Sequence, residues 1–84
     1  MNVEEIQNFL DKHELPKGKY LKIQFKKRDA IFGLFVKDRD YNDLKSKNFW
    51  RIVTSTHLEE FNKSNNVNLA KIFSGSEFSR LSVV

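Results

Sequence analysis

The spacing of the apolar residues changes once along this chain, near Tyr20, and this change limits the possible folds more than any other feature. Before Tyr20, apolar side chains recur every three or four positions, which is typical of an amphipathic helix. Asn2 and Glu5 stand where a capping box begins such a helix, so we predict a helix over residues 3–14. After Tyr20 the apolar period is two, which predicts strands with one buried face.

Five short strands are expected in the remainder of the chain, over about residues 20–84. They cover residues 20–25, 30–37, 49–56, 67–73 and 78–84. Residues 57–66 are expected to form a polar loop or a single helical turn. Gly33 lies within the second strand, where glycine marks a sharp bend or the close approach of another backbone. The expected fold is therefore mainly β with one N-terminal helix, namely a small, strongly bent, five-stranded antiparallel barrel.

Size and composition indicate a single domain over residues 1–84, because so short a chain cannot close two hydrophobic cores. Cysteine is absent, which fits a reducing compartment. The first ten residues lack the positive charge of a secretory signal, and no apolar run is long enough to cross a bilayer. We therefore expect a cytoplasmic protein with no membrane partner. The expected core contains Trp50 and the rings of Phe25, Phe32, Phe35, Phe73 and Phe78.

The charge of the chain is concentrated in one segment. Residues 17–51 hold 11 basic and 4 acidic side chains, a net charge of +7, whereas the remainder has a net charge of −3. A basic segment can bind a polyanion such as a nucleic acid. The commoner explanation is that lysines solvate the outer faces of strands and protect sheet edges from aggregation. Both explanations stay open on the sequence.

Acidic side chains are densest in the stretch VKDRDYNDL. Asp38, Asp40 and Asn42 match the first, third and fifth positions of a calcium loop. Asp43 stands where that loop needs glycine, and Phe49 stands where it needs glutamate, so calcium is excluded. Catalysis by paired carboxylates is disfavoured, because interleaved lysines and arginine lower carboxylate pKa values. We predict a turn whose Asp and Asn side chains bond local backbone amides, and we expect no catalytic residue, metal or cofactor.

Two short motifs resemble those of the Sm-like family, which includes the Sm and LSm proteins and the bacterial Hfq relatives. Gly33, Asp38 and Asn42 are similar to the glycine, aspartate and asparagine of the first motif. The second motif is matched, with its spacing, by Phe73, Gly75, Phe78 and Leu81. The resemblance implies a bent Sm-like, SH3-type barrel with an N-terminal helix, rings formed by the pairing of edge strands, and, in many members, binding of single-stranded RNA.

Two positions differ from the family pattern. Asp40 stands where RNA-binding members place a ring on which a base stacks, and Ser74 stands where they place an arginine. A carboxylate and a hydroxyl supply neither the π contact nor the positive charge that favours a polyanion. The resemblance therefore predicts the fold more directly than it predicts the usual uridine pocket.

The first functional hypothesis is a non-enzymatic, Sm-like binding module that forms homo-oligomers and contacts single-stranded RNA through its basic segment. The residues expected to carry this contact are Tyr41, Asn42, Lys45, Lys47 and Arg51. The lysines and the arginine would bind phosphates, and the tyrosine would stack under a base. The alternative is a small barrel that binds protein, or only copies of itself, through exposed strand edges without nucleic acid.

Overall fold

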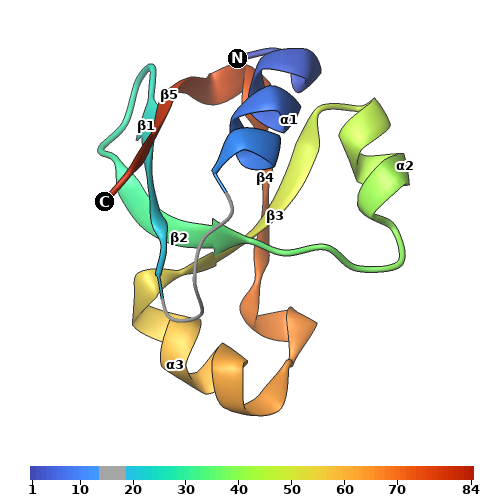
Figure 1. Ribbon diagram of the computed structural model, residues 1–84, viewed down its shortest axis with the longest axis vertical. Coiled ribbons are helices and arrows are strands. Elements are labelled where there is room, and N and C mark those ends of the chain that lie inside the picture. The colour runs from blue at the N-terminus through green and yellow to red at the C-terminus, as the bar shows by residue number, and fades with distance from the viewer. Residues whose placement is uncertain (14–18) are drawn as a thin grey trace.

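The computed structural model of the protein describes residues 1–13 and 19–84, arranged as a single antiparallel sheet with helices around it (Figure 1). Helices α1 and α3 lie at opposite ends of the molecule, and α2 lies beside α1 (Figure 1). In chain order the elements are α1 (Val3–Lys12), β1 (Leu21–Phe25), β2 (Ile31–Phe35), α2 (Tyr41–Ser46), β3 (Phe49–Thr54), α3 (Ser55–Ser64), the 3-10 helix η1 (Val67–Leu69), β4 (Lys71–Ser74), the 3-10 helix η2 (Gly75–Glu77) and β5 (Phe78–Val83).

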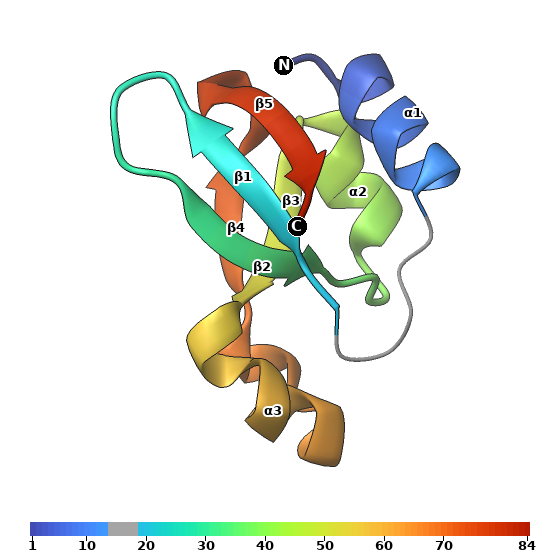
Figure 2. The ribbon, with the colours of Figure 1, turned by 60° about the vertical axis from the view of Figure 1, so that its left-hand side comes forward.

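The five strands form one sheet in the order β4-β3-β2-β1-β5, and every neighbouring pair is antiparallel (Figure 2). The prediction of five antiparallel strands is therefore confirmed. Among the described residues β4 and β5 do not pair with each other, so the sheet is open and has two free edges. The expected barrel is not confirmed, because a closed barrel requires those outer strands to share hydrogen bonds.

Helix α1 begins as the sequence predicts. The Asn2 side chain accepts a hydrogen bond from the Glu5 backbone N–H at 2.8 Å, and the Glu5 carboxylate accepts one from the Asn2 N–H at 3.0 Å. This reciprocal pair satisfies two backbone donors that the first turn of a helix would otherwise leave unpaired. The helix ends at Lys12, with His13 as its C-terminal cap, so it stops short of the predicted end at residue 14, which lies outside the described residues.

Gly33 is required where β2 meets β3. It lies opposite Thr54 in the register of these strands. A Cβ atom on Gly33 would lie 2.6 Å from the Val53 carbonyl oxygen and 2.8 Å from the Cγ2 atom of Ile52. Both distances are shorter than non-bonded contacts allow, so the two backbones can approach this closely only because the side chain is absent. The predicted close approach of another backbone at Gly33 is therefore confirmed.

The amino terminus closes the turn between β4 and β5. The Met1 amino group donates hydrogen bonds to the carbonyl oxygens of Gly75, at 3.0 Å, and Phe78, at 2.7 Å. The Asn48 side chain donates to the Met1 carbonyl at 3.0 Å and accepts from the Trp50 indole N–H at 2.8 Å. A methyl group at Gly75 would overlap this Asn48 side chain, so the second glycine is also required by close packing.

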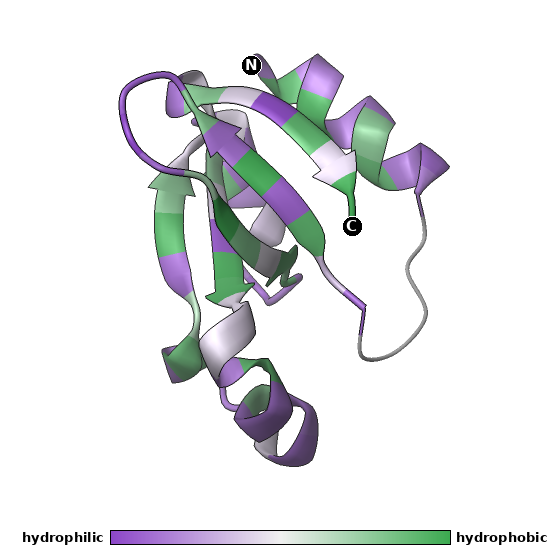
Figure 3. Ribbon diagram, turned by 90° about the vertical axis from the view of Figure 1, so that its left-hand side faces the viewer, coloured by the Kyte–Doolittle hydropathy of each residue, from purple (hydrophilic) through white to green (hydrophobic). Residues whose placement is uncertain are grey.

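The main core lies between α1 and the sheet. Its buried members are Ile6, Ile23, Phe25, Trp50, Ile52, Phe78 and Leu81. Figure 3 shows the corresponding alternation of apolar and polar residues along β1. The expected burial of Trp50 is confirmed at 1 % exposure, but the prediction for Phe32 is wrong, since that side chain is 39 % exposed. Successive side chains of a strand point to opposite faces, and Phe32 lies on the face opposite its neighbour Ile31, which packs against the core.

The prediction of one helix is wrong, because the structure has two further α-helices, α2 and α3. Residues 57–66 were expected to be a polar loop or a single helical turn, but α3, a helix of ten residues, covers most of them. The loop prediction overlooked Leu58 and Phe61, which are three positions apart and therefore share one helix face. Leu58 is buried against Val36 and Val53, and this packing stabilises the helix.

The predicted fourth strand is shorter than expected. The sequence pattern suggested a strand over residues 67–73, whereas β4 covers only Lys71–Ser74. Asn66 explains the difference, because its side chain accepts a hydrogen bond from the Asn68 backbone N–H at 3.0 Å and so begins η1. Side-chain caps of this kind stabilise a helical turn in competition with a strand.

In the described part of the chain, every helix is too short or too polar to span a membrane.

Candidate functional site

The five residues predicted to bind RNA are brought together on α2 and the adjacent strand. We call this group the α2 cluster; it consists of Tyr41, Asn42, Lys45, Lys47 and Arg51. The first three lie on α2, Lys47 is its C-terminal cap and Arg51 lies in β3, against which α2 packs. These five residues therefore lie near one another in the fold, as the RNA-binding hypothesis requires. The contacts of each side chain decide whether the cluster is free to bind a ligand.

Tyr41 attaches α2 to the rest of the protein. Its ring meets the Trp50 ring edge to face, with centroids 6.0 Å apart, and its hydroxyl donates a hydrogen bond to the Gln7 side chain of α1 at 2.8 Å. The ammonium groups of Lys37 and Lys45 lie 5.4 and 6.0 Å from the ring centroid. Burial raises the pKa of the Tyr41 hydroxyl, so the phenol stays neutral. Because other groups already surround the ring, a base could stack on it only by displacing them.

Arg51 is held by a carboxylate. Its Nε donates to Asp40 Oδ1 at 3.2 Å, and its Nη2 donates to Asp40 Oδ2, which makes a two-pronged ion pair. The hydrogen bond from Arg51 holds the pKa of Asp40 below its usual value, and the same bond raises the pKa of Arg51. Bidentate pairing uses the donor geometry with which arginine would otherwise bind a phosphate. A phosphate would therefore have to compete with Asp40 for this guanidinium.

The acidic stretch differs from the polar turn that we predicted. Asp40 immediately precedes α2, but its side chain makes no capping bond to the helix and binds Arg51 instead. Asp38 and Asp43 flank it, so the surface around α2 mixes both signs of charge. Among the described residues, the exposed Lys47 and the partly buried Lys45 of the α2 cluster are in no ion pair, and Asn42 adds an uncharged amide. This is a weaker phosphate site than the sequence suggested.

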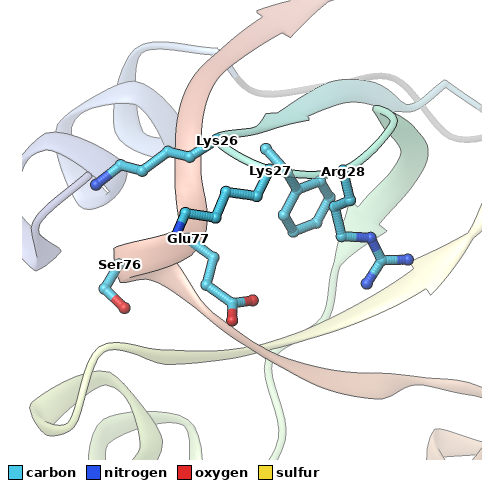
Figure 4. A pocket seen from close by; sticks show the side chains of 6 residues that line it. Lys26, Lys27, Arg28, Ser76 and Glu77 are labelled. Carbon is cyan, nitrogen blue, oxygen red and sulfur yellow. The ribbon is translucent and has the colours of Figure 1, made fainter.

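A second group of cations lies on the turn between β1 and β2. We call it the basic turn; it consists of Lys26, Lys27 and Arg28 (Figure 4). In the described part of the chain, the ion pairs are Arg51–Asp40 and Lys63–Glu59, so the basic turn has no carboxylate at ion-pair distance there. The predicted strands end at residue 25 and resume at residue 30, so the sequence indicates only that residues 26–29 connect them. Three consecutive cations were the available signal, but nothing in the sequence shows that they border a pocket.

The two free edges of the sheet expose apolar side chains. Ile72 on β4 is 51 % exposed and Val83 on β5 is 49 % exposed. An unpaired outer strand also presents backbone N–H and C=O groups that another strand can bind. Lys71 and Arg80 are the charged residues on these strands. Each edge is therefore a surface on which a further strand could add.

No known protein family, curated protein or solved structure matches this chain. The resemblance to the Sm-like family therefore stays a prediction. Among residues 1–13 and 19–84, no group of three or more histidine, cysteine, aspartate or glutamate side chains is arranged to hold a metal ion.

Proposed function

We propose that this protein is a non-enzymatic binding module that assembles with copies of itself through β4 and β5. The observation that carries the proposal is the strand order, which leaves β4 and β5 as the two free edges, each with an exposed aliphatic side chain. The edges belong to different strands, so pairing β4 of one copy with β5 of the next is heterologous and can close into a ring. This is also the mode of assembly that the Sm-like resemblance implies.

The physical reason for assembly is the small size of the domain. A chain of 84 residues buries a limited fraction of its surface, so pairing with a neighbour adds useful apolar burial. Ile72 and Val83 would leave water at the new junction, and the unpaired backbone groups would gain partners. Neither edge strand contains proline, the residue that most directly blocks strand addition.

The test is the mass of the protein in solution, measured by native mass spectrometry and light scattering. The wild type is expected to be an oligomer, and Ile72→Lys and Val83→Lys are each expected to be monomers. An equal mixture of these two variants should form dimers, because each retains the one edge that the other lacks. Phe32→Lys is the matched control, since it places the same charge at an exposed ring on an inner strand. A monomeric wild type at every concentration would contradict the proposal.

Single-stranded RNA is a second candidate ligand. The observation that favours it is that, among the described cations of the basic segment, only Arg51 is in an ion pair. The remaining cations can release counterions when they bind phosphates, which makes the affinity depend on salt concentration. We therefore expect a fluorescent oligouridine to bind at low salt, with log K falling linearly as log salt concentration rises.

Two double variants locate the phosphate contacts for this candidate. Lys27→Gln with Arg28→Gln removes two cations of the basic turn, and Lys45→Gln with Lys47→Gln removes two from the α2 cluster. Each lost phosphate contact should reduce the salt slope by about 0.7. The free cations of the basic turn predict the larger reduction for the first pair. Absence of oligouridine binding at low salt would reject RNA as a ligand without affecting the assembly proposal.

A further inference from the structure

A pocket of about 350 Å³ lies where the basic turn meets η2 (Figure 4). Its lining residues are Phe25, Lys26, Lys27, Arg28, Ser76 and Glu77. The Lys26 backbone N–H donates to the Glu77 carbonyl oxygen at 2.9 Å, so a backbone hydrogen bond joins the two walls. The pocket is therefore formed between two connected backbone segments rather than by flexible side chains alone. Its volume falls within the range of small-molecule sites.

Positive charge and a flat apolar surface meet in this pocket. The Arg28 guanidinium carbon lies 4.9 Å from the centroid of the Phe25 ring and 6.0 Å from that of Phe73. In Figure 4, Lys26, Lys27 and Glu77 lie to the left of the pocket and Arg28 lies to the right. The guanidinium therefore covers the Phe25 ring, which is only 8 % exposed, and its outward face is the flat surface on which a planar group can stack.

The polar groups restrict the ligand further. Lys27 and Arg28 donate hydrogen bonds and carry charge without an ion-pair partner among the described residues. They suit a phosphate, for which arginine and lysine are the usual ligands. The Glu77 carboxylate can only accept hydrogen bonds, so it repels an anion but suits an N–H donor. A ligand that satisfies the whole pocket therefore combines an anion, a planar body and N–H groups.

We propose that this pocket binds a nucleoside monophosphate whose base presents N–H donors, such as guanine. Lys27 and Arg28 bind the phosphate, the heterocycle stacks on the outward face of the Arg28 guanidinium, whose other face covers Phe25, and Glu77 accepts hydrogen bonds from the base. The nucleotide can be free or can be the phosphorylated end of an RNA strand, because both carry the same group. None of the lining residues lies in β4 or β5, although η2 joins these two edge strands, and the pocket shares Lys27 and Arg28 with the RNA candidate.

Isothermal titration calorimetry of the full chain tests the proposal with five ligands. Guanosine monophosphate should bind more tightly than guanosine, which lacks the phosphate, and more tightly than inorganic phosphate, which lacks the base. A short RNA with a 5′-terminal guanosine phosphate should bind more tightly than the same RNA without that phosphate if strand ends are the natural source. If only the free nucleotide binds, the source is a mononucleotide, and the pocket assignment still stands.

The variants assign the roles of the side chains. Arg28→Gln and Lys27→Gln should each weaken guanosine monophosphate binding by about tenfold, as expected for loss of a charged hydrogen bond. Lys47→Gln is the control, because it makes the same charge change at an exposed side chain that does not line the pocket. Glu77→Ala should weaken binding of the nucleotide but strengthen binding of inorganic phosphate, since it removes both an acceptor and a repulsive charge.

Three results would overturn the proposal. The first is failure of guanosine monophosphate to bind the wild type at millimolar concentration. The second is an equal loss of binding for Lys47→Gln and Arg28→Gln, which would indicate only a diffuse positive field. The third is equal affinity for inorganic phosphate and the nucleotide. Oligouridine binding under these conditions would leave the RNA candidate intact while the nucleotide pocket failed.

Discussion

The α2 cluster and the basic turn both contain lysine and arginine side chains, but the surroundings of these side chains differ. In the α2 cluster Arg51 binds Asp40, and the Tyr41 ring packs against Trp50 while its hydroxyl binds α1. In the basic turn Lys27 and Arg28 have no ion-pair partner among the described residues and border a pocket. Whether a cation is available to bind an anion therefore depends on the partners that the fold places beside it. We interpret the α2 cluster as mainly structural and the basic turn as the better anion site.

The largest expected effect is a loss of folding stability when Tyr41 is replaced. Tyr41→Ala removes the contact with Trp50 and the hydrogen bond to Gln7. It should lower the free energy of unfolding by roughly 2–3 kcal/mol, less than the cost of deleting a fully buried ring. Tyr41→Phe, which loses only the hydroxyl, should cost about 1 kcal/mol. Urea unfolding measures both variants, and unchanged stability in Tyr41→Ala would show that the ring is free rather than structural.

The next largest expected effect is on the affinity for oligouridine when Asp40 is replaced. Asp40→Asn removes the carboxylate that holds Arg51 and leaves an amide of similar size. Arg51 then becomes available to a phosphate, so oligouridine affinity at low salt should rise several-fold and its salt slope should become steeper. Fluorescence anisotropy measures the change, and Asp43→Asn is the control because it removes a nearby acidic charge that is in no ion pair of the described residues. Equal effects of the two variants would show that Asp40 acts only through net charge.

The sequence does not predict the side-chain contacts that these variants test. Local signals predicted the Asn2 cap, the five strands and the close contact at Gly33, because each depends on neighbouring residues or on strand period. The Arg51–Asp40 pair joins residues 11 positions apart on different elements, so it exists only after α2 packs on β3. The pocket likewise needs the basic turn and η2, which are distant in the chain.

The helices were missed for a related reason. Leu58 and Phe61 lie among polar residues, and their shared face becomes informative only when Val36 and Val53 are known to lie beneath it. Tertiary packing, rather than intrinsic propensity, supplies most of the stability of such short helices. The same holds for α2, whose Tyr41 contacts Trp50. Without a capping signal such as the Asn2–Glu5 capping box of α1, an amphipathic pattern over so few residues is too weak to separate a helix from a polar loop.

A smaller effect is expected on folding stability when the pH is lowered. The pKa of Asp40 is lowered in the folded protein by its hydrogen bond to Arg51. A lowered pKa means that the ion pair contributes stability above the unfolded-state pKa, about 3.9, and that this contribution is lost as the pH falls through the folded-state value. Wild-type stability should therefore fall more steeply below about pH 4 than that of Asp40→Asn. Urea midpoints from pH 7 to pH 2 measure this, and parallel curves would show that the pair adds nothing.

The smallest expected effect is on the stability of basic-turn variants. Arg28→Gln loses the contact of its guanidinium with the Phe25 ring, which at an exposed position is worth about 0.5–1 kcal/mol. Lys27→Gln should change the free energy of unfolding by less than about 0.5 kcal/mol, as is usual for exposed surface residues. Thermal melting checks both. A large loss of stability in Lys27→Gln would indicate that the basic turn is structural, and the contrast with the α2 cluster would disappear.

The most direct measurement of this contrast is a nuclear magnetic resonance titration of the ¹⁵N-labelled protein with guanosine monophosphate. Amide signals of the basic turn, Phe25 and η2 should shift in proportion to the bound fraction, and those of α2 and Arg51 should stay in place. Shifts concentrated in α2 and Arg51, with the basic turn unchanged, would contradict the account.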